Sequence, residues 1–461
     1  MSGLSATLYT AGAALRAHQL GVQTAGANVA NAATPGYSAR QVILAANPQN
    51  GALSGVTVVS VSRKDEPFLR ASSIRANVQN GYASARADLL SQMEGVLAPV
   101  DGSRVEHALE SFFSSASALA SDPSSVAARQ TVLTQARAIA VAFNSTAADI
   151  SALSSQVDAR LSSATTHASD LARQLAELNQ RVGSSAPSPD QPSSLLDERD
   201  RVAKELAGIV GGDVLTDKDG NVNIIALGTS IVAGKEALSL STARNATSGK
   251  LDVVVTGYGK ESAVVTARAT QGEIGGLISV RDRDLMAQTN ALDALAFDVQ
   301  TAVNGVHQAG VGLDGASGRA LFAGASSKAG AAAALRVDPT TAQSPRYVTA
   351  ASSATTLPGD NRAALALAAL YTQPAASSGT ATFAEAERSR AGSVASAAQN
   401  ANTDRDDAVA QSDLTASLLS SATGVSTDEE MIQLAQFQRA YQASAKVIAT
   451  VNEMLDTLVK L

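Results

Sequence analysis

The sequence predicts a mainly α-helical protein with a β-rich insertion (α+β), built on an elongated helical bundle with long heptad helices. Three observations support this prediction. Apolar residues recur every seven positions at both ends of the chain and in its middle, which is typical of helices that pack along a narrow seam. Residues 222–266 contain short β-like runs separated by glycine and Asp/Asn turns, which indicates a small antiparallel β domain. Aromatic residues make up only 3% of the chain, so small side chains must fill the core.

The C-terminal segment 424–461 has the pattern of a coiled-coil helix. Thr427 followed by Glu430 matches a capping box, which predicts that the helix begins there. The apolar positions that follow alternate by three and four residues, so they share one side of the helix. These seam residues are Leu434, Phe437, Tyr441, Ile448, Val451, Leu455 and Leu458.

The N-terminal segment 1–41 has a second seam and then a turn. Its seam residues are Leu8, Leu15, Val22 and Val29, with an alanine-containing line of Leu4, Ala11, His18 and Ala25 beside them. We expect this helix to end near Asn31, because a proline and a permissive glycine follow. The residues expected to fix the turn are Asn28, Asn31, Thr34, Pro35, Gly36 and Tyr37, although Asn28 and Asn31 could simply cap the helix.

Two seamed helices at opposite ends of the chain are expected to pair with each other or with other copies. Two core helices of a single globular domain would show the same periodicity, so the pattern alone leaves both interpretations open. With paired N- and C-terminal coiled-coil helices, both ends of the chain would belong to one structure, and the segments between them would be nested inside it.

Between these ends, residues 42–183 are predicted to form an extended arm or hairpin and then the first part of the helical domain. A helix from Phe68 breaks at Ala98-Pro99, and another restarts after Asp122-Pro123. The most regular seam follows and predicts a helix over 147–182, about 50 Å long at 1.5 Å per residue. A proline- and serine-rich linker over 183–193 ends this part.

The second half of the chain is predicted to leave the helical domain and return to it. Residues 184–275 form the β-rich inserted domain, which begins with a short charged helix over 195–210. A return helix over 276–310 precedes a loop-rich segment, 311–360, and the last part of the helical domain, 361–423. The full division is 1–41, 42–183, 184–275, 276–310, 311–360, 361–423 and 424–461.

Composition excludes several functional classes. The formal net charge of −7 argues against a nucleic-acid partner. The chain has no cysteine, which rules out disulfides and thiolate zinc sites. No apolar run reaches the roughly 18 residues of a membrane span. No cleavable secretory signal is apparent either, so the usual rules predict a cytoplasmic protein.

The sequence predicts no catalytic, cofactor-binding or metal site. Residues 310–315 match GxGxxG in letters but follow a helix instead of a strand. Asp217 to Gly220 resembles part of a calcium loop without its final glutamate, so a hairpin turn is the better interpretation. The four histidines lack ligand spacing and are expected on the surface or in the seams; they are His18, His107, His167 and His307.

Both ends of the chain resemble signatures of the flagellar rod, hook and hook-associated axial proteins. The N-terminal match runs from Asn28 to Ser38, and the C-terminal match includes Asp428 to Met431, Phe437-Gln438 and Ala440 to Ala445. The interior resembles the hook-associated protein 1 family. This interior match rests on Phe112 to Ala120, Asp122-Pro123, Ala127 to Gln130, Leu195 to Asp200, Asp219 to Asn221, Gly272 to Leu277 and Val303 to His307.

The resemblance implies a structural protein and not an enzyme, which assembles as a ring-like layer between the flagellar hook and filament without a cofactor. Its implied partners are further copies of itself, the hook protein, an adjacent hook-associated protein or the filament, and a cytoplasmic export chaperone at the C-terminal region. The implied location is extracellular, reached through the flagellar type III apparatus without a cleaved signal peptide. We further expect residues 1–31 and 427–461 to be poorly ordered in the free protein and to fold on assembly.

Two alternatives remain at this point. A hook or distal rod protein would share the terminal signatures but should lack segments 195–200 and 272–277. A cell-wall hydrolase with axial ends would need a compact catalytic domain, yet the 184–275 insertion contains no histidine.

Overall fold

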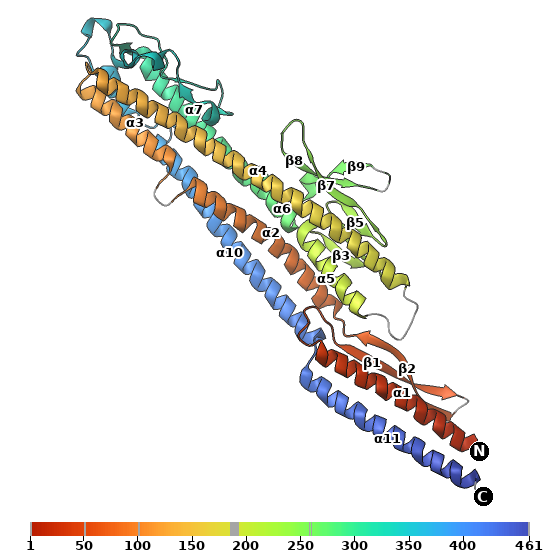
Figure 1. Cartoon of the computed structure of the whole chain (residues 1–461). Helices are drawn as coiled ribbons and strands as arrows, with labels where there is room; N and C mark the ends of the chain where they lie inside the picture. Colours follow the sequence, from red (N-terminus) through yellow and green to blue (C-terminus); the bar gives the residue numbers. More distant parts are fainter. Residues whose placement is uncertain are drawn as a thin grey trace. The chain divides into compact units, whose positions relative to one another are not determined.

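Long helices and small antiparallel sheets make up the fold, which confirms the predicted class of mainly α with a β-rich insertion (Figure 1). The computed structural model describes residues 2–49, 52–99, 102–184, 193–257, 259 and 261–459. The predicted linker lies mostly outside these residues. Contacts group the chain into two compact units, and each is described by itself. Unit 1 contains Met1–Tyr82, Ser163–Gly275 and Asp407–Leu461, and unit 2 contains Ala83–Ser162 and Gly276–Asp406.

The two terminal helices and a hairpin form one part of unit 1. Helix α1 spans Ser2–Ala30, strands β1 and β2 span Arg40–Gln49 and Ala52–Arg63, and helix α11 spans Thr427–Val459. The hairpin is antiparallel, and Arg40 pairs with Arg63 at its base. The N-cap residue of α11 is Ser426, one residue before the predicted Thr427. The Ser426 hydroxyl accepts a hydrogen bond from the Glu429 amide at 3.4 Å.

The β-rich part of unit 1 contains two small sheets. Helix α5 (Ser193–Val210) precedes a four-stranded sheet in the order β3-β4-β5-β6 and a three-stranded sheet in the order β7-β8-β9, all pairs antiparallel. The predicted strands near 222–227, 230–233 and 251–256 are confirmed. The strands are β3 (Asp213–Thr216), β4 (Val222–Ala226), β5 (Thr229–Ala233), β6 (Glu236–Ala237), β7 (Ser239–Arg244), β8 (Leu251–Thr256) and β9 (Ser262–Val264).

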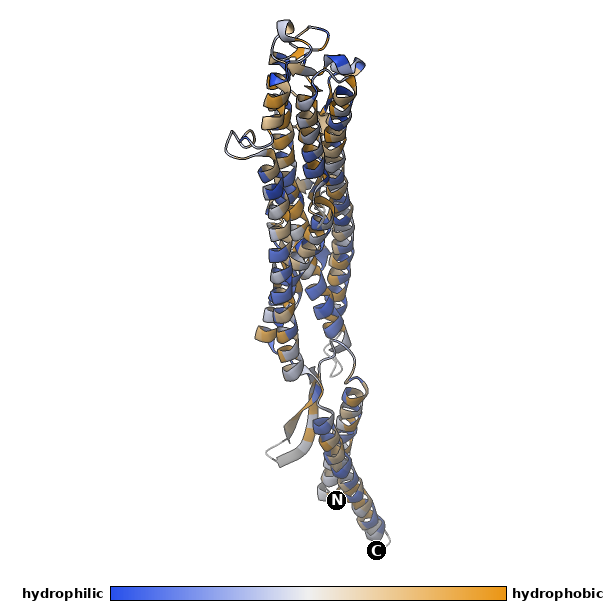
Figure 2. Cartoon of the chain, turned by 90° about the vertical axis from the view of Figure 1, so that its left-hand side faces the viewer, coloured by the Kyte–Doolittle hydropathy of each residue, from blue (hydrophilic) through white to orange (hydrophobic). Residues whose placement is uncertain are grey.

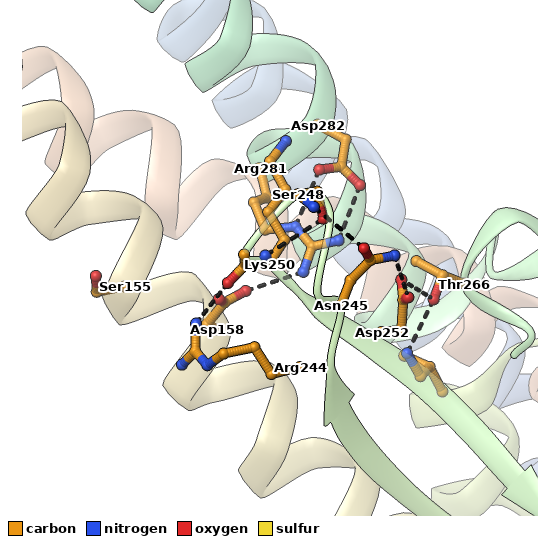
Figure 3. Close-up of polar contacts among 12 residues, drawn as sticks. Ser155, Asp158, Arg244, Asn245, Ser248, Lys250, Asp252, Thr266, Arg281 and Asp282 are labelled. Atoms are coloured by element: carbon orange, nitrogen blue, oxygen red, sulfur yellow. Dashed lines mark hydrogen bonds and ion pairs between the residues drawn. The ribbon is translucent and has the colours of Figure 1, made fainter.

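Buried polar side chains connect these sheets to the helices of unit 1. Asn179 of helix α4 donates to the carbonyls of Val222 and Gly234 at 2.9 and 2.7 Å and accepts from the Val222 amide at 3.0 Å. In the second sheet, Asp252 accepts from both Asn245 and Thr266 (Figure 3). The Asn179 bonds satisfy backbone groups that burial removes from water, whereas Asp252 links side chains within its own part of the β-rich domain.

Helix α4 is a single helix over Val126–Ser184, where the sequence predicted one helix after Pro123 and a second over 147–182. No proline or glycine occurs between Val126 and Arg181, so nothing breaks the helix before Gly183. Its residues 163–184 belong to unit 1 and the preceding ones to unit 2. The other long helices are α2 (Pro67–Leu97), α3 (Arg104–Ser121), α7 (Leu285–Ala309) and α10 (Phe383–Thr423).

In unit 2, a single π-helical turn over Val280–Asp284 lies between α6 (Gly272–Ser279) and α7. Arg281 in this turn is almost fully buried and pairs with Asp158 of α4 and with Asp282, each at 2.9 Å (Figure 3). Burial by itself would lower the pKa of Arg281, but the two carboxylates outweigh it and raise the pKa. The ion pairs therefore fix the π-helical turn to α4.

The loop-rich segment 311–360 contains short strands and turns, as predicted. Polar side chains of the long helices hold its backbone in place. Asp293 accepts from the amides of Gly330 and Ala332 at 2.7 and 2.9 Å, and Asn304 accepts from two amides near Phe322. The elements are β10 (Val311–Gly312), β11 (Phe322–Ala323), α8 (Ala331–Ala334), β12 (Arg336–Val337) and β13 (Thr349–Ala351), with 3₁₀ turns at Thr341–Gln343, Pro345–Tyr347 and Ala354–Thr356.

Aromatic side chains concentrate in the core of unit 2. Phe112 and Phe113 of α3 lie edge to face with ring centroids 5.1 Å apart, and Phe113 stacks on Phe383 at 5.9 Å. Phe322 contacts Phe112 at 6.1 Å. Helix α9 (Arg362–Ala369) packs on α3 beside this cluster. This aromatic cluster lies where Phe322 of the loop-rich segment meets the helices of its own unit.

Candidate subunit interface and signature turn

Helices α1 and α11 pack against each other within one chain. The Phe437 ring of α11 lies directly on Gly21 of α1: a β-carbon at Gly21 would be 2.6 Å from Cδ1 of the ring. His18 lies beside the same ring, with centroids 6.3 Å apart. Ala11 and Ala25 of the alanine-containing line are buried. Small residues on α1 therefore allow a close approach to α11.

The predicted seam residues are only partly covered in a single chain. Leu8, Leu15, Val22 and Val29 are all half-buried. On α11, Val451 is buried and Tyr441 remains 36% exposed, while the side chain of Leu458 lies outside the described residues. The other seam residues, Leu434, Phe437, Ile448 and Leu455, are half-buried. The pair thus leaves apolar surface available along both helices.

Asn28 is the central residue of the turn that follows α1. Its side chain is fully buried, donates to the Arg40 carbonyl at 2.8 Å and accepts from the Arg40 amide at 3.0 Å. It also accepts from the Tyr37 hydroxyl at 2.9 Å. One amide side chain therefore ties the end of α1 to the first residue of the hairpin.

The rest of the signature forms a tight turn. The Tyr37 amide donates to the Thr34 carbonyl at 3.2 Å, with Pro35 and Gly36 at the two central positions. Gly36 has φ +78°, a conformation that glycine adopts without the strain a side chain would add. Asn31 instead bonds back to the Ala27 carbonyl at 2.8 Å, so its contact is a local helix cap.

Tyr37 joins the turn to charged residues around it. The Arg40 guanidinium lies over its ring, 4.9 Å from the centroid. Burial is the main cause that raises the pKa of Tyr37; Arg40 opposes this shift, and the carboxylates of Asp197 and Glu430 add to it. The hydroxyl therefore stays protonated and can donate to Asn28.

An ion-pair network next to this turn was not predicted from the sequence. Arg63, at the end of β2, pairs with Asp197 at 3.0 Å and with Asp200 at 2.6 Å, and Arg70 pairs with Asp200 at 2.9 Å. Burial alone would lower the pKa of Arg63, but the two aspartates outweigh it and raise the pKa. The spacing of three residues places both aspartates on one face of α5, which was the available signal.

A cavity of about 350 Å³ lies within unit 1 between these elements. Its walls come from the signature turn, the end of the hairpin, α2, α5 and the end of α10. Lys204 on its wall donates to the Ser73 hydroxyl at 3.0 Å, and burial lowers the pKa of this lysine. A backbone hydrogen bond also joins two of these walls, from the Ala39 amide to the Thr423 carbonyl at 2.8 Å.

The other motifs have structural roles. Asp217 accepts from the amides of Asp219 and Asn221, both at 2.9 Å, and the pairing of β3 with β4 confirms the predicted hairpin turn. Asp314 of the GxGxxG match pairs with Arg319 at 2.6 Å. Among the described residues, no group of three or more histidines and carboxylates is placed to hold a metal ion.

His307 lies on the buried side of α7, in line with Val299 and Val303, and not on the surface. It is fully buried in unit 2, where Nδ1 lies 2.6 Å from the Arg319 carbonyl and Nε2 accepts from the Thr349 amide at 3.3 Å. This pattern requires the neutral tautomer with the proton on Nδ1. Burial, opposed by the bond to Arg319, lowers the pKa of His307 to about 4. Its place at the end of a helical seam gave no sign that residues 319 and 349 would cover it.

Comparisons with known proteins match both the interior and the C-terminal end. The model of the flagellar hook-associated protein FlgK helical domain matches residues 90–322. The chain belongs to the FlgK family of flagellar hook-associated proteins. The model of the flagellar basal body rod FlgEFG protein C-terminal region matches residues 419–461. The predicted family is therefore confirmed.

Curated FlgK-family relatives match along most of the chain. Flagellar hook-associated protein 1 of Bacillus subtilis (strain 168) is 28% identical over 502 residues, covering 98% of this chain and 97% of the relative. The Escherichia coli (strain K12) protein of the same name is 28% identical over 330 residues, covering 69% of this chain and 60% of that protein.

A solved structure supports the fold. It is described as the flagellar hook junction protein FlgK from Burkholderia pseudomallei and has 17% sequence identity and a TM-score of 0.67. The superposition covers 78% of this chain and 100% of the solved chain. In the described parts of this FlgK-family chain, no helix is both long enough and apolar enough to cross a membrane.

Proposed function

We propose that this chain is a structural subunit of the bacterial flagellum that assembles as a layer at the junction between hook and filament. The proposal rests mainly on helices α1 and α11, whose apolar seam residues stay half-buried when the two helices pair within one chain. The FlgK family of the chain supports the same role. Burying such residues between copies would release ordered water and favour assembly. The seams on Leu8 to Val29 and Leu434 to Leu458 carry the subunit packing, and Asn28 with Pro35, Gly36 and Tyr37 sets the turn away from it.

The proposed partners are further copies in a ring-like layer, the hook protein on one side, and an adjacent hook-associated protein or the filament on the other. Before assembly, the C-terminal region is the binding site of a cytoplasmic export chaperone, and the chain leaves the cell through the flagellar type III apparatus. The absence of cysteine supports this route, because no disulfide has to form or break during export.

A labelling experiment tests the proposed position. Because the chain has no cysteine, Val141→Cys at a side chain that is 62% exposed provides a single thiol for a maleimide dye. The proposal predicts one fluorescent focus per flagellum at the distal end of the hook. Label along the whole hook would favour a hook protein, and label at the cell-proximal end of the hook would favour a distal rod protein.

A further inference from the structure

The β1–β2 hairpin presents an uncharged outer face. Residues 41–62 contain no Asp, Glu, Lys or Arg, although 17% of the whole chain is charged. Two large apolar side chains point out of this face: Ile43 is 42% and Val59 is 55% exposed, whereas the neighbouring Leu44 points to the opposite face of its strand. Val59 is the extra residue of a β-bulge, since Ile43 pairs with Ser60 and Leu44 with Val58. The bulge thus turns an apolar side chain toward solvent.

The hairpin is a two-stranded sheet with no third strand among the described residues. Soluble proteins protect such exposed ribbons with charged side chains, which keep them from pairing with other molecules. This ribbon lacks that protection. Its inner side is already used, because Gly55 lies against α1, where a β-carbon would be 3.1 Å from Cγ2 of Thr10. The outer face is therefore built to be covered by another molecule.

Helix α11 has a second uncharged face beside its seam. Val447 and Met454 lie seven residues apart and are 43% and 52% exposed, in line with Ala440, Ala443 and Thr450. Figure 1 shows α1 between the hairpin and α11, and in Figure 2 hydrophobic and hydrophilic residues are interspersed along these two helices. The hairpin face and the α11 face thus lie on different elements of unit 1.

We propose that the outer face of the β1–β2 hairpin of one copy packs on the Val447–Met454 face of α11 of a second copy. A contact between two different faces of identical chains repeats from copy to copy and generates a ring or a helical layer. Both faces lack charge, so neither side has to bury an unpaired ion. The inference rests on the proposed assembly and names a contact within it.

A photo-cross-linker tests the contact in the full-length chain. With p-benzoylphenylalanine in place of Val59, flagella assembled in cells are irradiated and the adducts are analysed by mass and by peptide mapping. The expected adduct has about twice the 46.6 kDa mass of this chain and links residue 59 to 440–454 of a second copy. The same cross-linker at Val141, which is 62% exposed, should give no adduct with 440–454. An adduct with a different protein, or no adduct, overturns the proposal.

Charge substitutions supply a second measurement. Val59→Glu should lower the amount of this chain in purified flagella at least about tenfold, whereas Val264→Glu, at a strand residue that is 63% exposed, should leave it unchanged. Adding Val447→Lys to Val59→Glu should restore incorporation by pairing the two charges. Normal incorporation of Val59→Glu would refute the contact. It would leave the proposed function intact, because that function is tested separately by the position of the Val141→Cys label and by the flagella of cells that lack the chain.

Discussion

Gly21 provides the sharpest test of how α1 and α11 pack. In the interior of a helix, Gly→Ala usually stabilises by about 0.5–1 kcal/mol because alanine loses less backbone freedom. Here the added methyl would lie 2.6 Å from the Phe437 ring, and overpacking of this kind costs about 1–3 kcal/mol. We therefore expect Gly21→Ala to destabilise the helix pair by about 1 kcal/mol, which changes an opening equilibrium about fivefold.

Limited trypsin digestion of the full-length chain measures this opening. Trypsin can cleave at Arg16 in α1 and Lys446 in α11 only when these helices open. If cleavage is slower than reclosing, the cleavage rate is proportional to the fraction of molecules in the open form. We expect both ends to be trimmed before α4, because α1 buries mainly small side chains against α11. Gly21→Ala should speed this trimming about fivefold.

Matched glycines in the same helix provide the control. Gly12 and Gly26 have no atom within 4 Å of a built β-carbon, so Gly12→Ala and Gly26→Ala should slow the trimming about two- to fivefold. In a Phe437→Leu background the flat ring is gone, and Gly21→Ala should lose its penalty. If Gly21→Ala slows trimming as Gly12→Ala does, the Phe437 ring does not lie on Gly21 and the described pairing is wrong.

Three further predictions follow from the structure. Asn28→Ala removes all three hydrogen bonds of this side chain and should destabilise the terminal part of unit 1 by about 2–3 kcal/mol, seen as faster trimming at Arg40. Asn28→Asp should be no milder, because it buries a carboxylate and places an oxygen where the amide now donates to the Arg40 carbonyl. Ile448→Asp places a carboxylate in the seam and should reduce incorporation into flagella while residues 60–420 stay folded. Gln442→Asp, at an exposed position of the same helix, is the control. Normal incorporation of Ile448→Asp would show that Ile448 does not contribute to subunit packing. His307 binds a proton near pH 6.5 in the unfolded chain but only near pH 4 in the folded chain, so the free energy of unfolding should fall by on the order of 3 kcal/mol as the pH drops through this window. Thermal unfolding of the parent and of His307→Gln between pH 7.5 and 4.5 measures this fall. Equal pH dependence of the two proteins would contradict it.

Periodicity predicted the elements of this chain better than their partners. The heptads located α1, α7 and α11, because a seam of apolar residues depends only on helical geometry. They did not show that Phe437 would lie on Gly21, since contact between helices depends on side-chain shape across more than 400 residues of sequence. The continuous helix α4 was missed because Asn144 to Thr146 are weak helix formers, yet packing keeps them helical.

Polar contacts between distant segments left little trace in the sequence. Asn28 was assigned to the turn, but its bonds to Arg40 and Tyr37 depend on the hairpin folding back along α1. Asp197 and Asp200 shared a helical face, yet nothing indicated Arg63 as their partner. Such side-chain bonds have no period, so only the folded chain brings the partners together.

Electron microscopy of flagella from cells that lack this chain, with filament subunits assayed in the medium, tests the central claim most directly. A structural layer between hook and filament predicts complete hooks without filaments, together with filament subunits lost to the medium. Restoring the intact chain should restore the filaments. Missing hooks would place the protein earlier along the axis, and normal filaments would contradict the proposed role.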